Sequence, residues 1–212
     1  MKNTDNKICI IGTGGFAKET LCCLLDIWKS KKIDPTDRVI FMEKDDKYIA
    51  GKIMGFEIIP QSQLDFKNYS LTVAIGDPKL RKNVVDSLPL NCTFENIIHP
   101  SAIISEWVKI GAGCIITAGV VLTCDISIGK QCHLNLLTTI GHDCTIGDYF
   151  TSAPSVNISG SCKLGNSIYI GTNASLKQGL TICDDVVIGM GALVLKDINQ
   201  KGTYVGNPLR PI

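Results

Sequence analysis

The sequence of 212 residues has neither a long apolar run nor an excess of charge. No stretch approaches the roughly 18 apolar residues of a membrane-spanning helix, and the opening residues, MKNTDNK, lack the apolar core of a signal peptide. Lys and Arg number 14 against 13 Asp and Glu in residues 1–95, and seven against seven in residues 96–212, so we expect no basic face for a phosphate backbone. These absences predict a cytoplasmic protein with neither a membrane nor a nucleic acid as its partner.

Metal-ligand spacing is also missing, because none of the ten cysteines forms a Cys-x-x-Cys pair. Four of them lie two residues before a regularly spaced aliphatic residue: Cys114, Cys132, Cys144 and Cys162. A thiol in such an inward position acts as a compact apolar group. The sequence therefore predicts reduced, structural cysteines and no metal site.

Aliphatic residues recur at every sixth position from Ile98 to Val194, and only Ser152 interrupts the series. A period of six fits neither the 3.6-residue period of a helix nor the alternation of an open sheet. A β-sandwich, the alternative, has no reason to keep this register over so many repeats. The pattern is typical of a parallel β-helix, in which three short strands form one coil and stacked coils share an aliphatic core. Glycines after these aliphatic residues, as at Gly111 and Gly129, are expected to permit the backbone dihedrals of the corners.

Residues 1–95 show strands alternating with helices instead. A short apolar strand over residues 7–11 leads into Gly12-Thr13-Gly14-Gly15-Phe16-Ala17 and then into a helical pattern. This G-x-G-x-x-A turn lets the backbone approach a phosphate at a helix N-terminus, although a tight turn without a ligand would have the same pattern.

Two further strands, predicted over residues 38–42 and 71–75, end at Glu43 and at Gly76-Asp77. The carboxyl ends of parallel strands share one edge of a sheet, so these residues should lie near the glycine turn. The second mononucleotide unit of a dehydrogenase is missing, which argues against a redox cofactor.

One pair of repeats concentrates polar residues: Asn135, His142, Asp143, Asp148 and Ser152. His142 should point outward, where an imidazole can accept a proton near neutral pH and the adjacent Asp143 can fix its tautomer. A solvated His-Asp pair on a turn is the alternative. His99 and His133 have no neighbouring acid in the sequence and are expected to be structural.

Several segments together resemble the PglD-like and sialic-acid O-acetyltransferase family of sugar acyltransferases: GTGGFAKE, IGDPKLRK, IHPSAIIS, the six-residue repeats, GHDCTIG and VIGMGALVLKDI. The resemblance covers essentially the whole chain. It implies an α/β, half-Rossmann-like domain in residues 1–95 that binds a nucleotide sugar, followed by a left-handed parallel β-helix in residues 96–212. It also implies a homotrimer with acetyl-CoA in the groove between neighbouring coils.

The resemblance assigns roles to individual residues. His142 becomes the general base, Asp143 orients it, and Asn135 lines the same cleft. Coenzyme contacts fall on Gly160, Gly171, Thr172, Met190 and Gly191. Sugar-nucleotide contacts fall on Gly12, Gly14, Gly15, Glu43, Lys44, Gly76 and Asp77. Phe16 and Thr151 stand where relatives carry histidines, and Glu43-Lys44 replaces the usual aspartate pair, which leaves the identity of the acceptor open.

The predicted reaction is acetyl transfer from acetyl-CoA to the amine of a nucleotide-linked amino sugar, as used in bacterial surface-glycan synthesis. Direct attack needs proximity, a base and an oxyanion donor, for which the Gly160 backbone amide is a candidate. Cys144 lies in an inward position, which argues against a nucleophilic role. O-acetylation of a sugar of the sialic-acid type would use the same base on a hydroxyl. A non-catalytic solenoid that binds sugar nucleotides would need neither the base nor the coenzyme groove.

Overall fold

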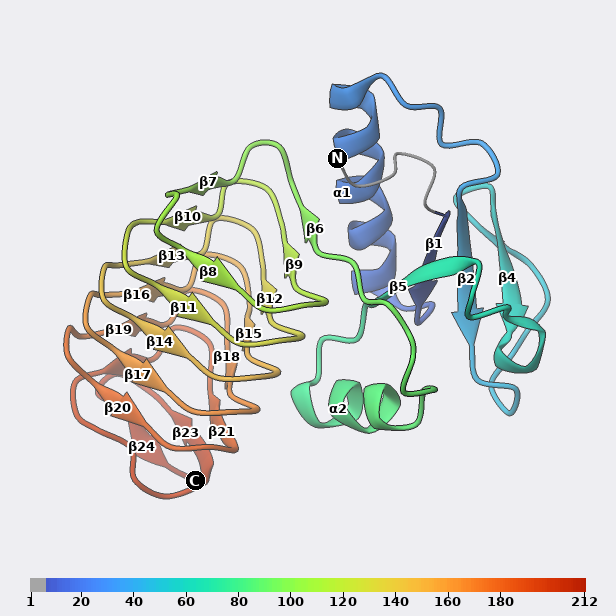
Figure 1. Cartoon of the computed structure of the whole chain (residues 1–212). Coiled ribbons are helices and arrows are strands. Elements are labelled where there is room, and N and C mark those ends of the chain that lie inside the picture. The colour runs from blue at the N-terminus through green and yellow to red at the C-terminus, as the bar shows by residue number, and fades with distance from the viewer. Residues whose placement is uncertain (1–6) are drawn as a thin grey trace.

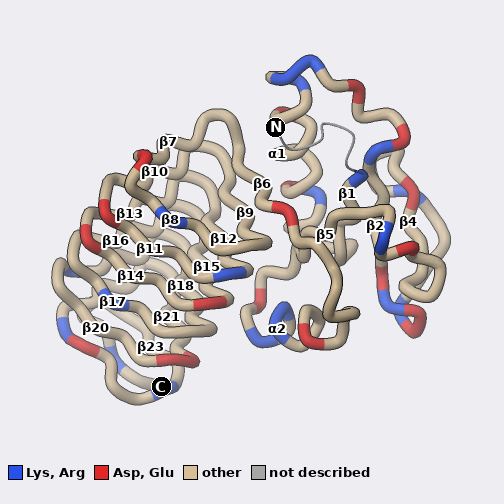
Figure 2. The backbone as a smooth tube through the Cα atoms, in the orientation of Figure 1, with Lys and Arg blue, Asp and Glu red and all other residues tan. Residues whose placement is uncertain are grey.

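The computed structural model describes residues 7–212 and shows an α/β half packed against a β-helix (Figure 1). The prediction that no signal peptide opens the chain rests largely on residues 1–6, which lie outside this range. No helix within residues 7–212 is long and apolar enough to cross a membrane. Along the backbone, Lys and Arg positions and Asp and Glu positions both occur in each half (Figure 2).

The α/β half is built on a five-stranded sheet in the order β3-β4-β2-β1-β5. Its elements are β1 (Lys7–Ile11), α1 (Gly15–Lys31), β2 (Val39–Glu43), β3 (Lys52–Ile53), β4 (Phe56–Pro60), the 3-10 turn η1 (Gln61–Gln63), β5 (Tyr69–Val73) and α2 (Pro78–Asp86). Strand β1 pairs in parallel with both β2 and β5, so the carboxyl ends of these three strands share one edge. Apolar side chains of α1 cover one face of the sheet, and those of α2 cover the other. Between α2 and the β-helix, Phe94 forms a single isolated bridge with Leu71 of β5.

The second half is a parallel β-helix with three faces. The first face carries β6 (Ile97–Ile98), β9 (Ile115–Ile116), β12 (His133–Leu134), β15 (Thr151–Ser152), β18 (Tyr169–Ile170), β21 (Val186–Ile188), β23 (Gly202–Val205) and β24 (Arg210–Pro211). The second face carries β7 (Ile103–Ile104), β10 (Val121–Leu122), β13 (Thr139–Ile140), β16 (Asn157–Ile158), β19 (Ser175–Leu176) and β22 (Leu193–Val194). The third face carries β8 (Lys109–Ile110), β11 (Ser127–Ile128), β14 (Thr145–Ile146), β17 (Lys163–Leu164) and β20 (Thr181–Ile182). The predicted fold class is therefore confirmed.

The chain turns three corners in each coil. The first corner joins the first and second faces, the second corner joins the second and third faces, and the third corner leads back to the first face. Strands pair with those 18 residues away, as in β12 with β15, so each aliphatic position lies directly on its counterpart in the next coil. The aliphatic residues at every sixth position, here called the aliphatic ladder, and the four inward-pointing cysteines belong to one continuous core.

Glycine after the aliphatic residue serves close packing and not the corner dihedrals that the sequence suggested. Gly111 and Gly129 are not among the residues with positive φ, whereas a Cβ on Gly111 would lie 2.6 Å from the carbonyl carbon of Gly129 in the next coil. The left-handed dihedrals fall two residues later, at positions six apart such as Asp143 with φ +60° and Tyr149 with φ +58°. The expectation was wrong because stacking distance, which a local pattern does not report, decides these positions.

The two halves share an apolar core. Ile97 and Ile115 on the first face of the β-helix belong to the same buried cluster as Leu21 and Leu24 of α1. The outward side chains of the next two strands on this face, His133 and Thr151, are buried as well. The α/β half therefore packs against the N-terminal strands of the first face, from β6 to β15.

Candidate active site

His142 and Asp143 form a hydrogen-bonded pair at the second corner. Nδ1 of His142 lies 2.7 Å from Oδ2 of Asp143, and both side chains are about half exposed. A carboxylate only accepts hydrogen bonds, so Nδ1 carries the proton and Nε2 presents its lone pair. The geometry therefore gives an accessible imidazole nitrogen that can remove a proton.

Gly160 lies directly beneath the ring of His142. It occupies the equivalent position in the next coil, and a Cβ there would lie 2.7 Å from both Cε1 and Nε2 of the imidazole. Every other occupant of this corner position carries a side chain: Glu106, Cys124, His142, Gln178 and Lys196. The missing side chain at Gly160 is therefore what lets the imidazole lie flat against the next coil.

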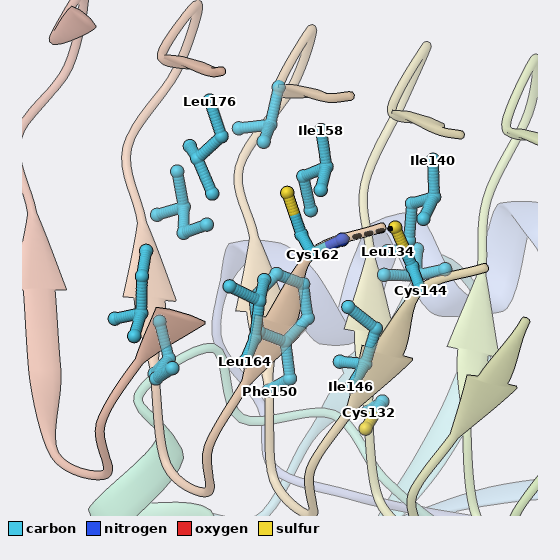
Figure 3. Close-up of a cluster of buried hydrophobic side chains, with 14 of the residues drawn as sticks. Cys132, Leu134, Ile140, Cys144, Ile146, Phe150, Ile158, Cys162, Leu164 and Leu176 are labelled. Atoms are coloured by element: carbon cyan, nitrogen blue, oxygen red, sulfur yellow. Dashed lines mark hydrogen bonds between the residues drawn. The ribbon is translucent and has the colours of Figure 1, made fainter. Parts of the chain in front are cut away.

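Cys144 lies two residues from His142 but points into the core (Figure 3). Its sulfur accepts a hydrogen bond from the backbone N–H of Cys162 at 3.4 Å. Hydrogen bonding with the Cys162 thiol, followed by burial, raises the pKa of the Cys144 thiol. A protonated, inward thiol is not a nucleophile, which agrees with the structural role predicted for it.

Ser152, the one break in the aliphatic ladder, belongs to an internal polar cluster. Its hydroxyl lies 2.9 Å from that of Thr138, and its carbonyl accepts a hydrogen bond from the Asn135 side chain at 2.6 Å. Asn135 is only 8% exposed and lies at the first corner, whereas His142 lies at the second. Within one chain the structure therefore does not bring Asn135 to the base.

The predicted nucleotide residues gather around a cleft of about 340 Å³ at the shared edge of β1, β2 and β5. Its lining includes six of the seven: Gly12, Gly14, Gly15, Glu43, Lys44 and Gly76. Asp77, the seventh, does not line the cleft, because its carboxylate caps α2 by accepting a hydrogen bond from the N–H of Leu80 at 2.7 Å. An aspartate before a proline commonly starts a helix, and this signal identifies it as a cap.

The N-terminus of α1 opens onto this cleft. Gly14 caps the helix without a side-chain hydrogen bond, and the first turn carries no acid, so its N–H groups and the positive end of the dipole face the cleft. Glu43 lies opposite, with Oε2 accepting a hydrogen bond from the hydroxyl of Thr13 at 2.8 Å. This arrangement suits a phosphate at the helix and a hydroxyl or base N–H at the carboxylate.

The predicted coenzyme residues lie at two different corners. Gly160 is at the second corner beside His142, whereas Gly171, Thr172, Met190 and Gly191 are at the first. Those at the first corner are stacked, since the N–H of Gly191 donates to the carbonyl of Thr172 at 2.8 Å. A single chain therefore does not assemble all five into one groove.

Known proteins share both halves of this architecture. The PglD N-terminal domain family matches residues 7–88, and the hexapeptide repeat of succinyl-transferase matches residues 102–124 and 164–196. The GDP-perosamine N-acetyltransferase of Escherichia coli O157:H7 is 32% identical over 175 residues, which cover 81% of this chain and 78% of that protein. The chain belongs to the PglD-like family of hexapeptide acyltransferases.

Solved structures of similar proteins match nearly the whole of this chain. A histidine-to-asparagine variant of perosamine N-acetyltransferase from Caulobacter crescentus, in complex with CoA and GDP-perosamine, has a TM-score of 0.87 at 27% identity. The match covers 98% of this chain and 97% of that one. The acetyltransferase domain of PglB from Neisseria gonorrhoeae FA1090, in complex with acetyl coenzyme A, has a TM-score of 0.87 at 26% identity over 98% of this chain and all of that one. The predicted family and the predicted acyltransferase activity are confirmed.

Phe16 and Thr151 lie at the junction of the two halves. Phe16, in the lining of the cleft, packs on the ring of His133 with centroids 4.8 Å apart. The hydroxyl of Thr151 donates to the carbonyl of Gly76 at 2.9 Å. Both residues therefore connect the cleft to the β-helix.

Sequence reasoning missed Arg81 and the acidic partner of His99. Arg81 is fully buried between α2 and the β-helix and reaches His133, whose pKa is lowered far below its usual value by burial and then by the Arg81 charge. Nε2 of His99 lies 3.1 Å from Oδ2 of Asp26 on α1, so His99 does have an acidic partner. These partners are more than 50 residues apart in sequence, and only the packing of the halves brings them together.

Proposed function

We propose that this acyltransferase moves the acetyl group of acetyl-CoA to the amine of a nucleotide-linked amino sugar. The observation that carries the proposal is one chain that holds both an accessible, tautomer-fixed imidazole and a phosphate-compatible cleft at a helix N-terminus. The names of the relatives support it, since the Escherichia coli protein is a GDP-perosamine N-acetyltransferase. The Caulobacter crescentus structure holds CoA together with GDP-perosamine.

In the proposed mechanism, Nε2 of His142 removes a proton from the acceptor nitrogen as that nitrogen attacks the thioester carbonyl. The C–N bond forms, the C–S bond breaks, and CoA leaves as a thiolate that takes up a proton. Asp143 stabilises the imidazolium and keeps Nδ1 protonated, and the Gly160 backbone amide is the proposed donor to the oxyanion. No covalent acyl-enzyme is needed, which agrees with the buried Cys144.

Release of CoA tests this function directly. The acceptors are GDP-perosamine, UDP- and dTDP-linked 4-amino sugars, and the corresponding 4-hydroxy sugars, with the product mass measured in each case. We expect CoA release and a gain of one acetyl group only with the amines. Turnover of the hydroxy sugars or of a sialic acid would favour O-acetylation, and binding without any CoA release would favour a non-catalytic solenoid.

The proposed trimer would complete the coenzyme groove. If the first corner of one copy lies against the second corner of its neighbour, Thr172 and Met190 of one chain face His142 and Gly160 of the next. Exposed apolar side chains occur at both corners, with Met190 76% exposed at the first and Leu195 46% at the second. Such residues are typical of surfaces that another subunit covers.

We therefore expect light scattering to give the mass of three chains at micromolar concentration. Met190→Asp should shift the chain toward monomers and lower activity in parallel, because a charge would be buried at the contact. Lys201→Asp, at an exposed position away from both corners, is the matched control. A fully active monomer would refute the shared groove.

The cleft should bind a nucleotide through Glu43 and should not bind NAD. Glu43→Gln removes a charged acceptor, and hydrogen bonds to charged groups contribute about 1.5–3 kcal/mol, so affinity for the nucleotide sugar should fall by roughly tenfold or more. Calorimetric titration measures it. Asp45→Asn, which changes an exposed acid bonded to Ser62, should leave the affinity unchanged. Tight binding of NAD, or an unaltered affinity in Glu43→Gln, would contradict this assignment.

A further inference from the structure

Arg81 is a buried cation whose hydrogen-bond partners, all within residues 7–212, include no carboxylate. Its side chain is fully buried, yet the pKa of the guanidinium falls only to about 10 through burial, so it stays charged at neutral pH. Its nitrogens lie within hydrogen-bond distance of seven acceptor atoms: the carbonyls of Gln131, Ile75, Gly76, Tyr149 and Phe150, Nδ1 of His133, and the hydroxyl of Thr151. Backbone dipoles thus replace a counter-ion.

The acceptors in the β-helix mark the two ends of one coil. Nε donates to the carbonyl of Gln131 at 2.9 Å, and Nη1 lies 3.0 Å from Nδ1 of His133, at the start of the coil. Nη2 donates to the carbonyl of Tyr149 and the hydroxyl of Thr151, each at 2.9 Å, where the next coil begins. His142 lies on the coil between these two attachments.

The remaining acceptors form the wall of the nucleotide cleft. Nη1 donates to the carbonyl of Ile75 at 2.6 Å and to that of Gly76 at 3.2 Å, and both residues line the cleft. The Thr151 hydroxyl donates to the same Gly76 carbonyl at 2.9 Å. One side chain therefore joins the cleft wall to both ends of the coil that carries the base.

Attachment of the two halves does not require this charge. The apolar cluster of α1 with Ile97 and Ile115 already holds them together. Burying a charge costs free energy that its hydrogen bonds must first offset, so attachment of the halves alone does not explain a guanidinium at this position. Apolar contacts are non-directional, whereas the planar guanidinium fork fixes both distance and orientation.

We infer that Arg81 is a positioning residue, which sets the nucleotide cleft relative to His142 so that nucleotide binding places the sugar amine at the base. This inference rests on the proposed function. Binding energy from a remote part of a substrate raises the rate only when a rigid frame transmits it to the reacting atoms, and a displacement of about 1 Å can cost roughly 10²-fold. Arg81 and the Thr151 hydroxyl supply that frame.

The test compares two acceptors in wild type and in Arg81→Lys. One is the nucleotide-linked amino sugar that gives the highest kcat/KM in the CoA-release panel, and the other is its sugar 1-phosphate, which lacks the nucleoside. Lysine keeps the charge and loses the fork. The ratio compared is kcat/KM for the nucleotide-linked sugar divided by kcat/KM for the sugar 1-phosphate. We expect this ratio to fall at least tenfold in Arg81→Lys, while kcat/KM for the sugar 1-phosphate and the KM for acetyl-CoA change less than about twofold.

Thr151→Val provides a second test that keeps the buried cation. Loss of the Thr151 hydroxyl removes one of the two hydrogen-bond donors to the Gly76 carbonyl, so the same ratio should fall several-fold. Thr151→Ser, which keeps a hydroxyl, should retain the wild-type ratio. Lys79→Ala is the matched control on α2, because Lys79 pairs with Asp185 of the β-helix at 3.7 Å without touching the cleft wall. Its ratio should be unchanged.

The outcomes separate this inference from the function beneath it. Wild type that releases no CoA with any amine refutes the proposed function itself. The positioning role alone is refuted if the wild type is active and a folded Arg81→Lys variant keeps the same ratio. It is also refuted if that variant is slowed equally with both acceptors. If the melting transition shows that Arg81→Lys does not fold, the comparison of Thr151→Val with Thr151→Ser decides.

Discussion

Replacing His142 with alanine is expected to lower kcat by roughly 10²–10⁴, the range typical of a lost general acid–base group. The hydrogen bond from Nδ1 to Asp143 leaves Nε2 as the only nitrogen of this ring that can accept a proton. The KM for acetyl-CoA should change little, because the base acts on the acceptor. Asp143→Asn should cost less, since the imidazole remains and only its orientation and the stabilisation of its charge are weakened.

The pH dependence of this loss also bears on the nucleophile. An amine becomes increasingly neutral as pH rises and then needs a base less, so the deficit of His142→Ala should shrink between pH 6 and 9. A hydroxyl acceptor does not lose its proton over this pH range, so the loss of kcat in His142→Ala should persist with it. The measurement is a pair of kcat profiles, with the fold of the variant checked by its unfolding transition. A folded variant with near wild-type turnover at every pH would remove His142 from the mechanism.

Replacing Gly160 with alanine should lower kcat by about 10²-fold while leaving the fold intact. The new Cβ would lie 2.7 Å from Cε1 and Nε2 of His142, so the imidazole must move. The ring is the end of a half-exposed side chain and can rotate into solvent, and Gly160 has no positive φ that alanine would strain. Misplacement of a catalytic group by about 1 Å is enough for a loss of this size.

Two controls separate this effect from general damage to the coil. Ser159→Ala changes the preceding exposed position without reaching the ring, and it should keep full activity. The double variant Gly160→Ala with His142→Ala should be no slower than His142→Ala alone, because the ring that the methyl group displaces is already gone. Additive losses, or a large drop in the unfolding temperature of Gly160→Ala, would mean that Gly160 acts independently of the imidazole.

Local patterns in the sequence were sufficient for the β-helix and for the pairing of His142 with Asp143. Each coil buries an aliphatic residue at every sixth position, so a slip of even one residue would expose the core, and the period therefore specifies the register. Because Asp143 directly follows His142 at the same corner, its carboxylate can reach Nδ1 of the ring without a contribution from distant segments. The glycine turn and the strand ends likewise predicted the cleft, since parallel strands bring Gly12, Glu43 and Gly76 to one edge.

Contacts that depend on how surfaces approach were decided by the tertiary structure. The glycines after the ladder residues are required by the distance between stacked backbones, and Gly160 by the ring above it. In the sequence Arg81 looks like an ordinary helix residue. Its β-helix partners lie 50 to 70 residues later in the chain, and only the packing of α2 on the β-helix buries Arg81 against them. Asp26 contacts His99 for the same reason. Local sequence patterns specify each half separately, whereas the packing of one half on the other selects which side chains meet between them.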